Sequence, residues 1–213
     1  MPVSSSGHTA LLPALLGWES YLELDDELRK SFEVALHFGT AGALLIALRG
    51  EVASVLRDLS VSRLARHGLE ILPPAVAAKF WERPIEQRFG DAQSVAFAQV
   101  VGGAALAAAD RSPAVRVAGD AGLLDALAIG VGQAVALIPG VSRNGATLTA
   151  VRLRGFERRS ANRLSRHAAL PIIVAATGLK GARLASRGLP RELRAPFAIG
   201  AGAAFVSTLA CAR

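Results

Sequence analysis

The chain has 213 residues and a formal net charge of +7, with 52% hydrophobic and only 19% charged residues. A mean hydropathy of +0.38 favours a polytopic membrane protein over a soluble, Ala-rich helical protein. Basic loops beside apolar spans suit anionic lipid, and no recognition motif indicates a nucleic-acid partner. The single cysteine excludes an intrachain disulfide and argues against zinc or cysteine catalysis.

The chain begins with a polar stretch, M-P-V-S-S-S-G-H-T over residues 1–9, and then an apolar piece, 9–17, that is too short to span a bilayer. A related stretch, P-G-V-S-R-N-G-A-T, occupies residues 139–147 and precedes the short apolar piece 146–151. Aligned on their valines, the two stretches share V-S-x-x-G-x-T. Because paired broken segments in the two halves of a membrane protein point to a binding site, we expect two re-entrant half-helices that build one site.

Five apolar stretches are candidates for membrane helices, which need roughly 20 apolar residues and about 17 at least. They cover residues 32–48, 94–109, 122–138, 167–185 and 196–212, and the second is marginal in length. Residues 69–81 are ambiguous, because Pro73-Pro74 would break a helix there; the segment is either interfacial or a poor span. Small residues recur in the apolar stretches and would let helices approach closely. These are Gly39, Gly42, Gly102, Gly103, Gly130, Gly132, Gly200 and Gly202.

The pattern predicts an all-α fold, a polytopic membrane helical bundle with inverted repeats and two re-entrant loops. We expect a single integral membrane domain over residues 1–213, with a first half of about 1–93 and a second half of about 94–213.

Charge predicts the orientation of this bundle. Residues 18–31 are mainly acidic and residues 49–67 mainly basic, so the positive-inside rule places the first segment outside and the second in the cytoplasm. If residues 69–81 span the membrane, both polar stretches fall on the external side. Counting the spans in this way also places residues 152–166 outside, although their six arginines favour the cytoplasm.

The second polar stretch, residues 139–147, combines glycines, hydroxyls and one arginine directly after an apolar run. Glycines permit nests in which successive N–H groups point into one concavity, and nests and helix N-termini both bind anions. Arg143 adds a planar fork suited to phosphate oxygens, and Ser142 and Thr147 can donate hydrogen bonds. An arginine at membrane depth is costly unless it is paired, and a phosphate would pair it. The alternative is a positive-inside arginine at a helix end.

The first polar stretch places serines beside a histidine. A serine next to an imidazole can serve as nucleophile and base, or His8 itself could attack phosphorus or donate a proton. Alone, the stretch equally fits a helix cap or a disordered start, so its match to the second stretch is what favours a site. Gln133, one turn before the second stretch, either lines that site or bonds a neighbouring helix.

Three stretches resemble the undecaprenyl-diphosphate phosphatase family, also called the bacitracin-resistance protein family. They are P-V-S-S-S-G-H at residues 2–8, S-F-E-V-A-L-H-F-G-T at 31–40 and G-Q-A-V-A-L-I-P-G-V-S-R-N-G-A-T at 132–147. The last resembles the family's most diagnostic motif, usually written with Ser-Arg-Ser-Gly, and Asn144 here replaces its second serine. The order of the spans also matches, so the similarity covers nearly the whole chain.

The resemblance implies a membrane hydrolase that removes the terminal phosphate from a C55 polyprenyl diphosphate and yields the monophosphate carrier of cell-wall synthesis. It implies a multi-pass protein of the bacterial plasma membrane with its site facing the external side. The implied partners are this lipid and the bilayer, with a homodimer left open. Carried over by motif, the catalytic residues would be Ser5, His8 and Arg143, with the nucleophile open between Ser5 and His8. The substrate-binding residues would be Ser4, Ser6, Gly7, Gly140, Ser142, Asn144, Gly145 and Thr147.

The resemblance further implies a divalent cation, Mg²⁺ or Ca²⁺, linked to two acidic residues on a helix that precedes the first polar stretch. The chain starts at Met1, where that helix would just have ended, and the last family helix also has no counterpart. We therefore expect a piece truncated at both ends, without these acidic ligands, and assign no metal ligand. The alternative reading is a catalytically impaired fragment, or a polyprenyl-phosphate binder or translocator, on the same fold.

Overall fold

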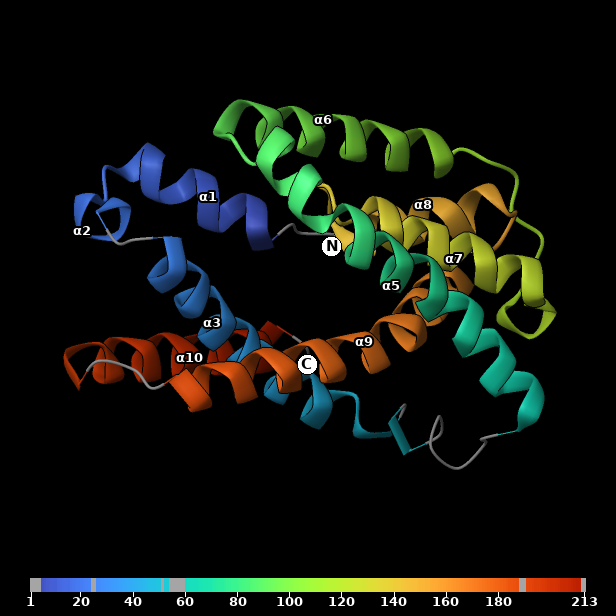
Figure 1. The fold of residues 1–213 in the computed structure, drawn as a ribbon. Helices are drawn as coiled ribbons and strands as arrows, with labels where there is room; N and C mark the ends of the chain where they lie inside the picture. Colours follow the sequence, from blue (N-terminus) through green and yellow to red (C-terminus); the bar gives the residue numbers. More distant parts are fainter. Residues whose placement is uncertain (1–4, 24–25, 51, 54–59, 188–190, 212–213) are drawn as a thin grey trace. The chain divides into compact units, whose positions relative to one another are not determined.

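The computed structural model describes residues 5–23, 26–50, 52–53, 60–187 and 191–211 (Figure 1). Within these ranges the regular structure is helical, and the one β-type contact is an isolated bridge between Arg116 and Phe156. The helices are α1 (Ser5–Leu16), α2 (Glu19–Leu22), α3 (Asp26–Ala47), α5 (Val61–Phe89), α6 (Ala92–Ala109), the 3₁₀ turn η1 (Ala118–Asp120), α7 (Leu123–Val135), α8 (Arg143–Leu153), α9 (Arg158–Arg187) and α10 (Arg191–Cys211).

Helices α6 and α10 have the length and composition of membrane-spanning helices, over Ala92–Ala109 and Leu193–Cys211. Shorter apolar helices cover Ser31–Ala47 and Leu123–Val135. On α6, Val100 is 70% exposed, which suits a helix whose outer face meets lipid rather than water. Together with the helical content, these helices confirm the expected all-α membrane fold.

The chain forms two compact units that interleave along the sequence. Unit 1 consists of Met1–Leu16 and Leu59–Ala169, and unit 2 of Gly17–Asp58 and Leu170–Arg213. The expected division of one domain into halves at about residue 93 stays a prediction.

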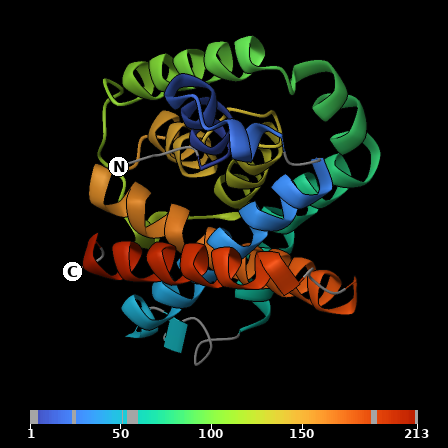
Figure 2. The same ribbon diagram turned by 90° about the vertical axis from the view of Figure 1, so that its left-hand side faces the viewer.

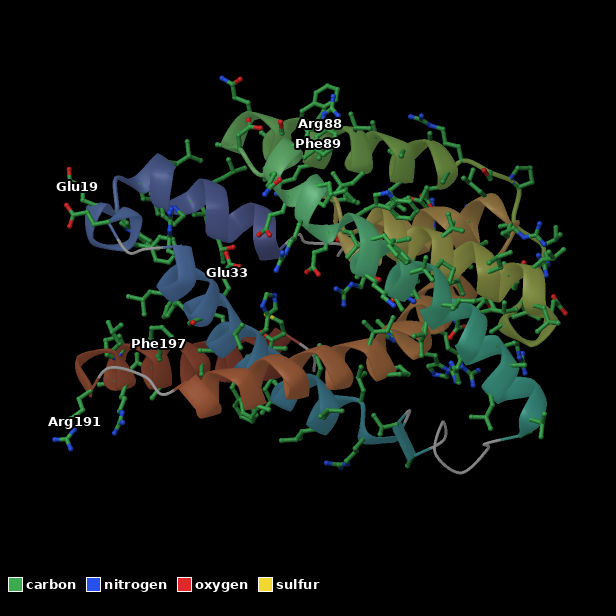
Figure 3. All side chains as sticks on the ribbon, in the orientation of Figure 1. Glu19, Glu33, Arg88, Phe89, Arg191 and Phe197 are labelled. Atoms are coloured by element: carbon green, nitrogen blue, oxygen red, sulfur yellow. The ribbon has the colours of Figure 1, made fainter. Side chains whose placement is uncertain are left out.

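In unit 2, α3 packs against α10 through small residues. A methyl group on Gly39 would overlap the carbonyl oxygen of Ala201, and one on Gly200 would lie 2.9 Å from the Phe32 ring. Phe32 meets Phe197 of α10 edge to face, with 5.3 Å between ring centroids; Figure 3 labels Phe197. The close approach expected of glycine-containing helices is confirmed here. In contrast, side chains added at Gly102, Gly103 or Gly202 would enter open space.

In unit 1, α7 packs against both α5 and α8, and α6 packs against both α1 and α8. A cluster of buried apolar side chains joins α7, α8 and the start of α9. Its members are Ile129, Val151, Phe156, Ala161 and Ala168.

Helix α5 runs unbroken from Val61 to Phe89 through Pro73, Pro74 and Pro84, so the predicted break at Pro73-Pro74 is wrong. An internal proline removes a helical hydrogen bond and costs about 3 kcal/mol or more. A continuous helix therefore needs compensation from a neighbour, and α7 packs against α5.

One end of unit 1 is held together by pairs of arginine and aspartate. Asp125, at the start of α7, accepts hydrogen bonds from Arg116 Nη2 at 2.7 Å and Arg154 Nε at 2.7 Å. Asp110, which follows α6, accepts from Arg158 Nη2 at 2.6 Å. Arg154 follows α8 and Arg158 begins α9. These pairs join the ends of four helices, and we call this region the arginine-rich end.

Candidate functional site

The described parts of the two V-S-x-x-G-x-T copies lie in two short helices. Helix α1, described as Ser5–Leu16, contains Gly7 and Thr9 of the first copy, and α8 begins at Arg143, directly after Ser142 of the second. Both helices pack against α6, and in Figure 2 the green helix α6 lies across the blue helix α1. With 12 and 11 residues, they are about 17 Å long, shorter than the roughly 30 Å of a bilayer's apolar core. These lengths match the expected half-helices.

The turn between α7 and α8 depends on glycine at Gly140. Its φ of +94° lies in the left-handed region, which side chains disfavour. A methyl group there would also overlap the carbonyl oxygen of Val95, in the first turn of α6. The tip of the α7–α8 hairpin, residues 136–142, therefore lies against the N-terminal end of α6, opposite to the arginine-rich end.

Directly after this tip, α8 begins with a serine cap. Ser142 is the N-cap, and its Oγ accepts a hydrogen bond from the backbone N–H of Gly145 at 3.3 Å. Gly145 itself is helical, so of the two anion-binding geometries considered, the helix N-terminus is the one present. The first N–H groups of a helix have no acceptor inside it and carry the positive end of the helix dipole. They are suited to bind an anion.

Arg143 is the first residue of α8, and its side chain is exposed. Within the described part of the chain, no hydrogen bond or ion pair engages its guanidinium. Arg116 and Arg154, in contrast, are each paired with Asp125. The Arg143 charge is thus available to an anion at the start of α8.

An apolar groove of about 1290 Å³ leads to this helix start. Its walls include Phe97 and Val101 of α6 and Leu127 and Val131 of α7. Small-molecule pockets measure about 300–1,000 Å³, so the groove has room for a longer apolar ligand. At the hairpin tip it is bordered by polar and small residues, and these are Gln93, Ser94, Gly140 and Ser142.

Two expected substrate-binding side chains of α8 contact α9 instead of lining the groove. The Thr147 hydroxyl lies 2.5 Å from the Ser165 hydroxyl and 3.0 Å from the carbonyl oxygen of Arg143. Ser165 donates to Asn144 Oδ1 at 2.9 Å. Thr147 is only 1% exposed. The contacts of Asn144 and Thr147 with Ser165 therefore hold the first turn of α8 against α9.

The residues expected from the first polar stretch are not placed by the structure. Ser4 lies outside the described residues, and Ser5, Ser6, Gly7 and His8 are described only as part of the α1 helix, without their side chains. The roles of Ser5 and His8 therefore stay predictions.

Sequence reasoning missed three polar residues that border this region. Gln93 and Ser94 line the groove near the hairpin tip, and Ser165 supports α8 from α9. Ser94 is the first residue of an expected span, and a polar residue at that position was the one sequence feature that could have indicated its place beside the groove. Ser165 lies in an arginine-rich segment that offered no signal.

The described residues do not provide a metal site of the usual kind. Among them, no three His, Cys, Asp or Glu side chains come close enough together to hold an ion. The divalent cation implied by the family resemblance thus finds no ligand set in this part of the chain, and we derive no step through it.

The fold and the site together define a class of protein: an all-α membrane protein in which a helix hairpin brings the capped N-terminus of a short helix to an apolar groove, with Arg143 as the first residue of that helix. The family model of the bacitracin resistance protein BacA matches residues 1–213. The chain therefore belongs to the BacA family, as its three motifs predict.

Proteins named undecaprenyl-diphosphatase are among the relatives of this chain. The Geobacter sulfurreducens protein is 38% identical, over 97% of this chain and 79% of its own length. The Trichlorobacter lovleyi protein is 36% identical, over 94% and 76%. A protein of Stutzerimonas stutzeri named undecaprenyl-diphosphatase 2 is 37% identical, over 84% and 69%.

Proposed function

We propose that this protein is a membrane phosphatase that hydrolyses undecaprenyl diphosphate to undecaprenyl phosphate and so regenerates the lipid carrier of cell-wall synthesis. The observation that carries the proposal is the apolar groove that ends at the start of α8, beside Ser142. A polyprenyl tail fits the groove by its apolar chemistry. The diphosphate fits the helix N-terminus and the neighbouring Arg143 by charge.

The reaction breaks the bond between the terminal phosphorus and the bridging oxygen, and the oxygen of water ends on the released phosphate. Arg143 and the first N–H groups of α8 would stabilise the negative charge that grows on the phosphoryl oxygens. A nucleophile or base would come from the first polar stretch, with Ser5 and His8 as the two candidates. Both belong to α1, which packs against α6 as α8 does.

We infer that the protein lies in the bacterial plasma membrane with the hairpin tip toward the external side. The arginine-rich end of unit 1 carries exposed arginines such as Arg111, Arg159 and Arg163, which the positive-inside rule places in the cytoplasm. The hairpin leaves this end and returns to it, while its tip lies against the opposite end of α6. In this orientation the site is external while residues 152–166 are cytoplasmic. The count of spans from the sequence had placed both on the external side. The homodimer stays a prediction.

The direct test is release of inorganic phosphate from undecaprenyl diphosphate by the purified protein in detergent, with and without added Mg²⁺ or Ca²⁺. Release that saturates with lipid concentration supports the proposal. Binding of the lipid without release under every condition would contradict it and would indicate a non-catalytic binder.

A further inference from the structure

Helix α5 has two backbone carbonyls that its own hydrogen bonds cannot satisfy. In an α-helix the N–H of each residue bonds to the carbonyl four residues earlier, and proline has no N–H. Pro73 and Pro74 therefore leave the carbonyls of Leu69 and Glu70 without their helical donors. A buried carbonyl without a donor is destabilising, so a neighbouring element is expected to cover both.

Helix α7 lies against both carbonyls with residues three positions apart and donates a hydrogen bond to that of Glu70. The side-chain amide of Gln133 donates from Nε2 to the carbonyl of Glu70 at 3.2 Å. Gly130 lies so close to Leu69 that a methyl group there would overlap the Leu69 carbonyl oxygen. Because residues i and i+3 share one face of a helix, Gly130 and Gln133 meet the two carbonyls together.

Gln133 is deeply buried, and its side-chain amide bonds to the carbonyl of Glu70. Its exposed fraction is 2%, and within the described part of the chain its Oε1 has no hydrogen-bond partner. Burying an amide whose oxygen has no partner is destabilising. We take the hydrogen bond that the same amide donates to Glu70 as the compensating interaction that favours glutamine at this position. Gln133 does not line the groove. Of the two alternatives drawn from the sequence, the structure therefore supports a bond to a neighbouring helix.

The same stretch of α7 also contacts α8. A methyl group on Gly132 would lie 3.0 Å from the carbonyl oxygen of Ala146, so the two backbones are in close contact. Residues 130–133 thus connect α5 on one side to the first turns of α8 on the other. A shift of α7 along α5 would move the start of α8, and Arg143 with it.

We propose that Gln133 is a positioning residue: its amide supplies the hydrogen bond that Pro74 cannot, and this fixes α7 on α5 and sets the position of the α8 start. The consequence for catalysis rests on the proposed phosphatase function. The bond itself does not, and it can be tested without activity.

The test is a double-mutant cycle of Gln133→Met and Pro74→Ala in the full chain, in detergent. Methionine keeps the length of the side chain but has no donor, whereas alanine at position 74 restores a backbone N–H that can bond to the Glu70 carbonyl. The measurements are the thermal unfolding midpoint, Tm, and kcat and KM for phosphate release from undecaprenyl diphosphate. Gln87→Met is the matched control, because Gln87 is an exposed glutamine on α5.

We expect Gln133→Met to lower the Tm by about 4 °C or more, and by less than half as much in the Pro74→Ala background. We expect its kcat to fall about tenfold in both backgrounds with KM changed less than about threefold, because the N–H of residue 74 satisfies the carbonyl without holding α7 in place. The Gln87→Met control should match the wild type. If Gln133→Met alone does not fold, the double variant should.

Equal losses of Tm in the two backgrounds would overturn the proposed bond. An unchanged kcat in folded Gln133→Met would overturn the positioning role. Should the wild type release no phosphate, the proposed function would fail, while the Tm cycle would still support or overturn the bond between α7 and α5.

Discussion

Ser165 on α9 donates a hydrogen bond to Asn144 on α8, with 2.9 Å between Oγ and Oδ1. The same hydroxyl lies 2.5 Å from Thr147 Oγ1, one turn along α8. The side chains of Asn144 and Thr147 on α8 therefore both contact one buried serine. Because Arg143 precedes Asn144, this contact holds the start of α8 from the side away from the groove.

Ser165→Ala removes both contacts and takes away the donor to Asn144 Oδ1, while Thr147 keeps the backbone carbonyls within reach of its hydroxyl. We expect a loss of about 1–3 kcal/mol in the free energy of unfolding and a lower kcat for phosphate release. Ser207→Ala is the matched control, because Ser207 is exposed and its hydroxyl bonds to the Ala204 carbonyl within its own helix. Thermal unfolding and phosphate release measure the two effects. Equal behaviour of the two variants would contradict a supporting role for Ser165.

Gly102→Phe fills the apolar groove from α6. Gly102 borders the groove, and a side chain there would enter open space. We expect KM for the C55 diphosphate to rise about tenfold, equivalent to about 1.4 kcal/mol. KM for a short-chain prenyl diphosphate should not change, because a short tail occupies less of the groove.

The matched control for the groove variant is Gly202→Phe, at a glycine on α10 that also faces open space. This variant should leave KM for both lipids unchanged. The same change of KM for long and short lipids in Gly102→Phe would contradict the assignment of the groove to the tail.

The pair of Asp110 and Arg158 should make stability depend on pH. The hydrogen bond from Arg158 lowers the pKa of Asp110 below its ordinary value of 3.8, so folding favours the ionised carboxylate. The contribution of Asp110 is complete above its unfolded pKa and is lost as pH falls through the lowered pKa. Tm measured from about pH 6 to about pH 3 should therefore fall less steeply in Asp110→Asn than in the wild type. Identical slopes would contradict the pairing.

The inferred orientation can be tested by cysteine labelling after Cys211→Ser, since Cys211 is the one native cysteine. Arg88 lies near the start of α6, as Figure 3 shows, and Arg111 lies just beyond its end; both are exposed. A membrane-impermeant thiol reagent added to intact cells should label Arg88→Cys and leave Arg111→Cys unlabelled. The reverse pattern would place the hairpin tip on the cytoplasmic side.

Local sequence patterns predicted the features that depend on neighbours in the chain. A serine before a short apolar run is typical of a helix start, and Ser142 caps α8 in this way. Glycines within apolar stretches predicted close helix contacts, which α3 and α10 make at Gly39 and Gly200.

Features that depend on a partner helix could not be predicted in this way. The Glu70 carbonyl, which Pro74 leaves without a helical donor, accepts its hydrogen bond from Gln133, which lies 63 positions away in sequence. Likewise, the contact between Ser165 and Asn144 depends on which face of α9 meets α8. No periodicity within either segment specifies such a pairing.

The most direct test of the account is phosphate release by Arg143→Ala, with undecaprenyl diphosphate in detergent and Tm measured in parallel. Arg143 is exposed, so its removal should leave Tm close to that of the wild type. Arg163→Ala, an exposed arginine on α9, is the matched control and should retain activity. We predict that Arg143→Ala lowers kcat/KM by about 10²–10³-fold or more, because it removes a charged donor to the phosphoryl oxygens. Release at the wild-type rate by a folded Arg143→Ala protein would contradict the central claim that this guanidinium binds the diphosphate.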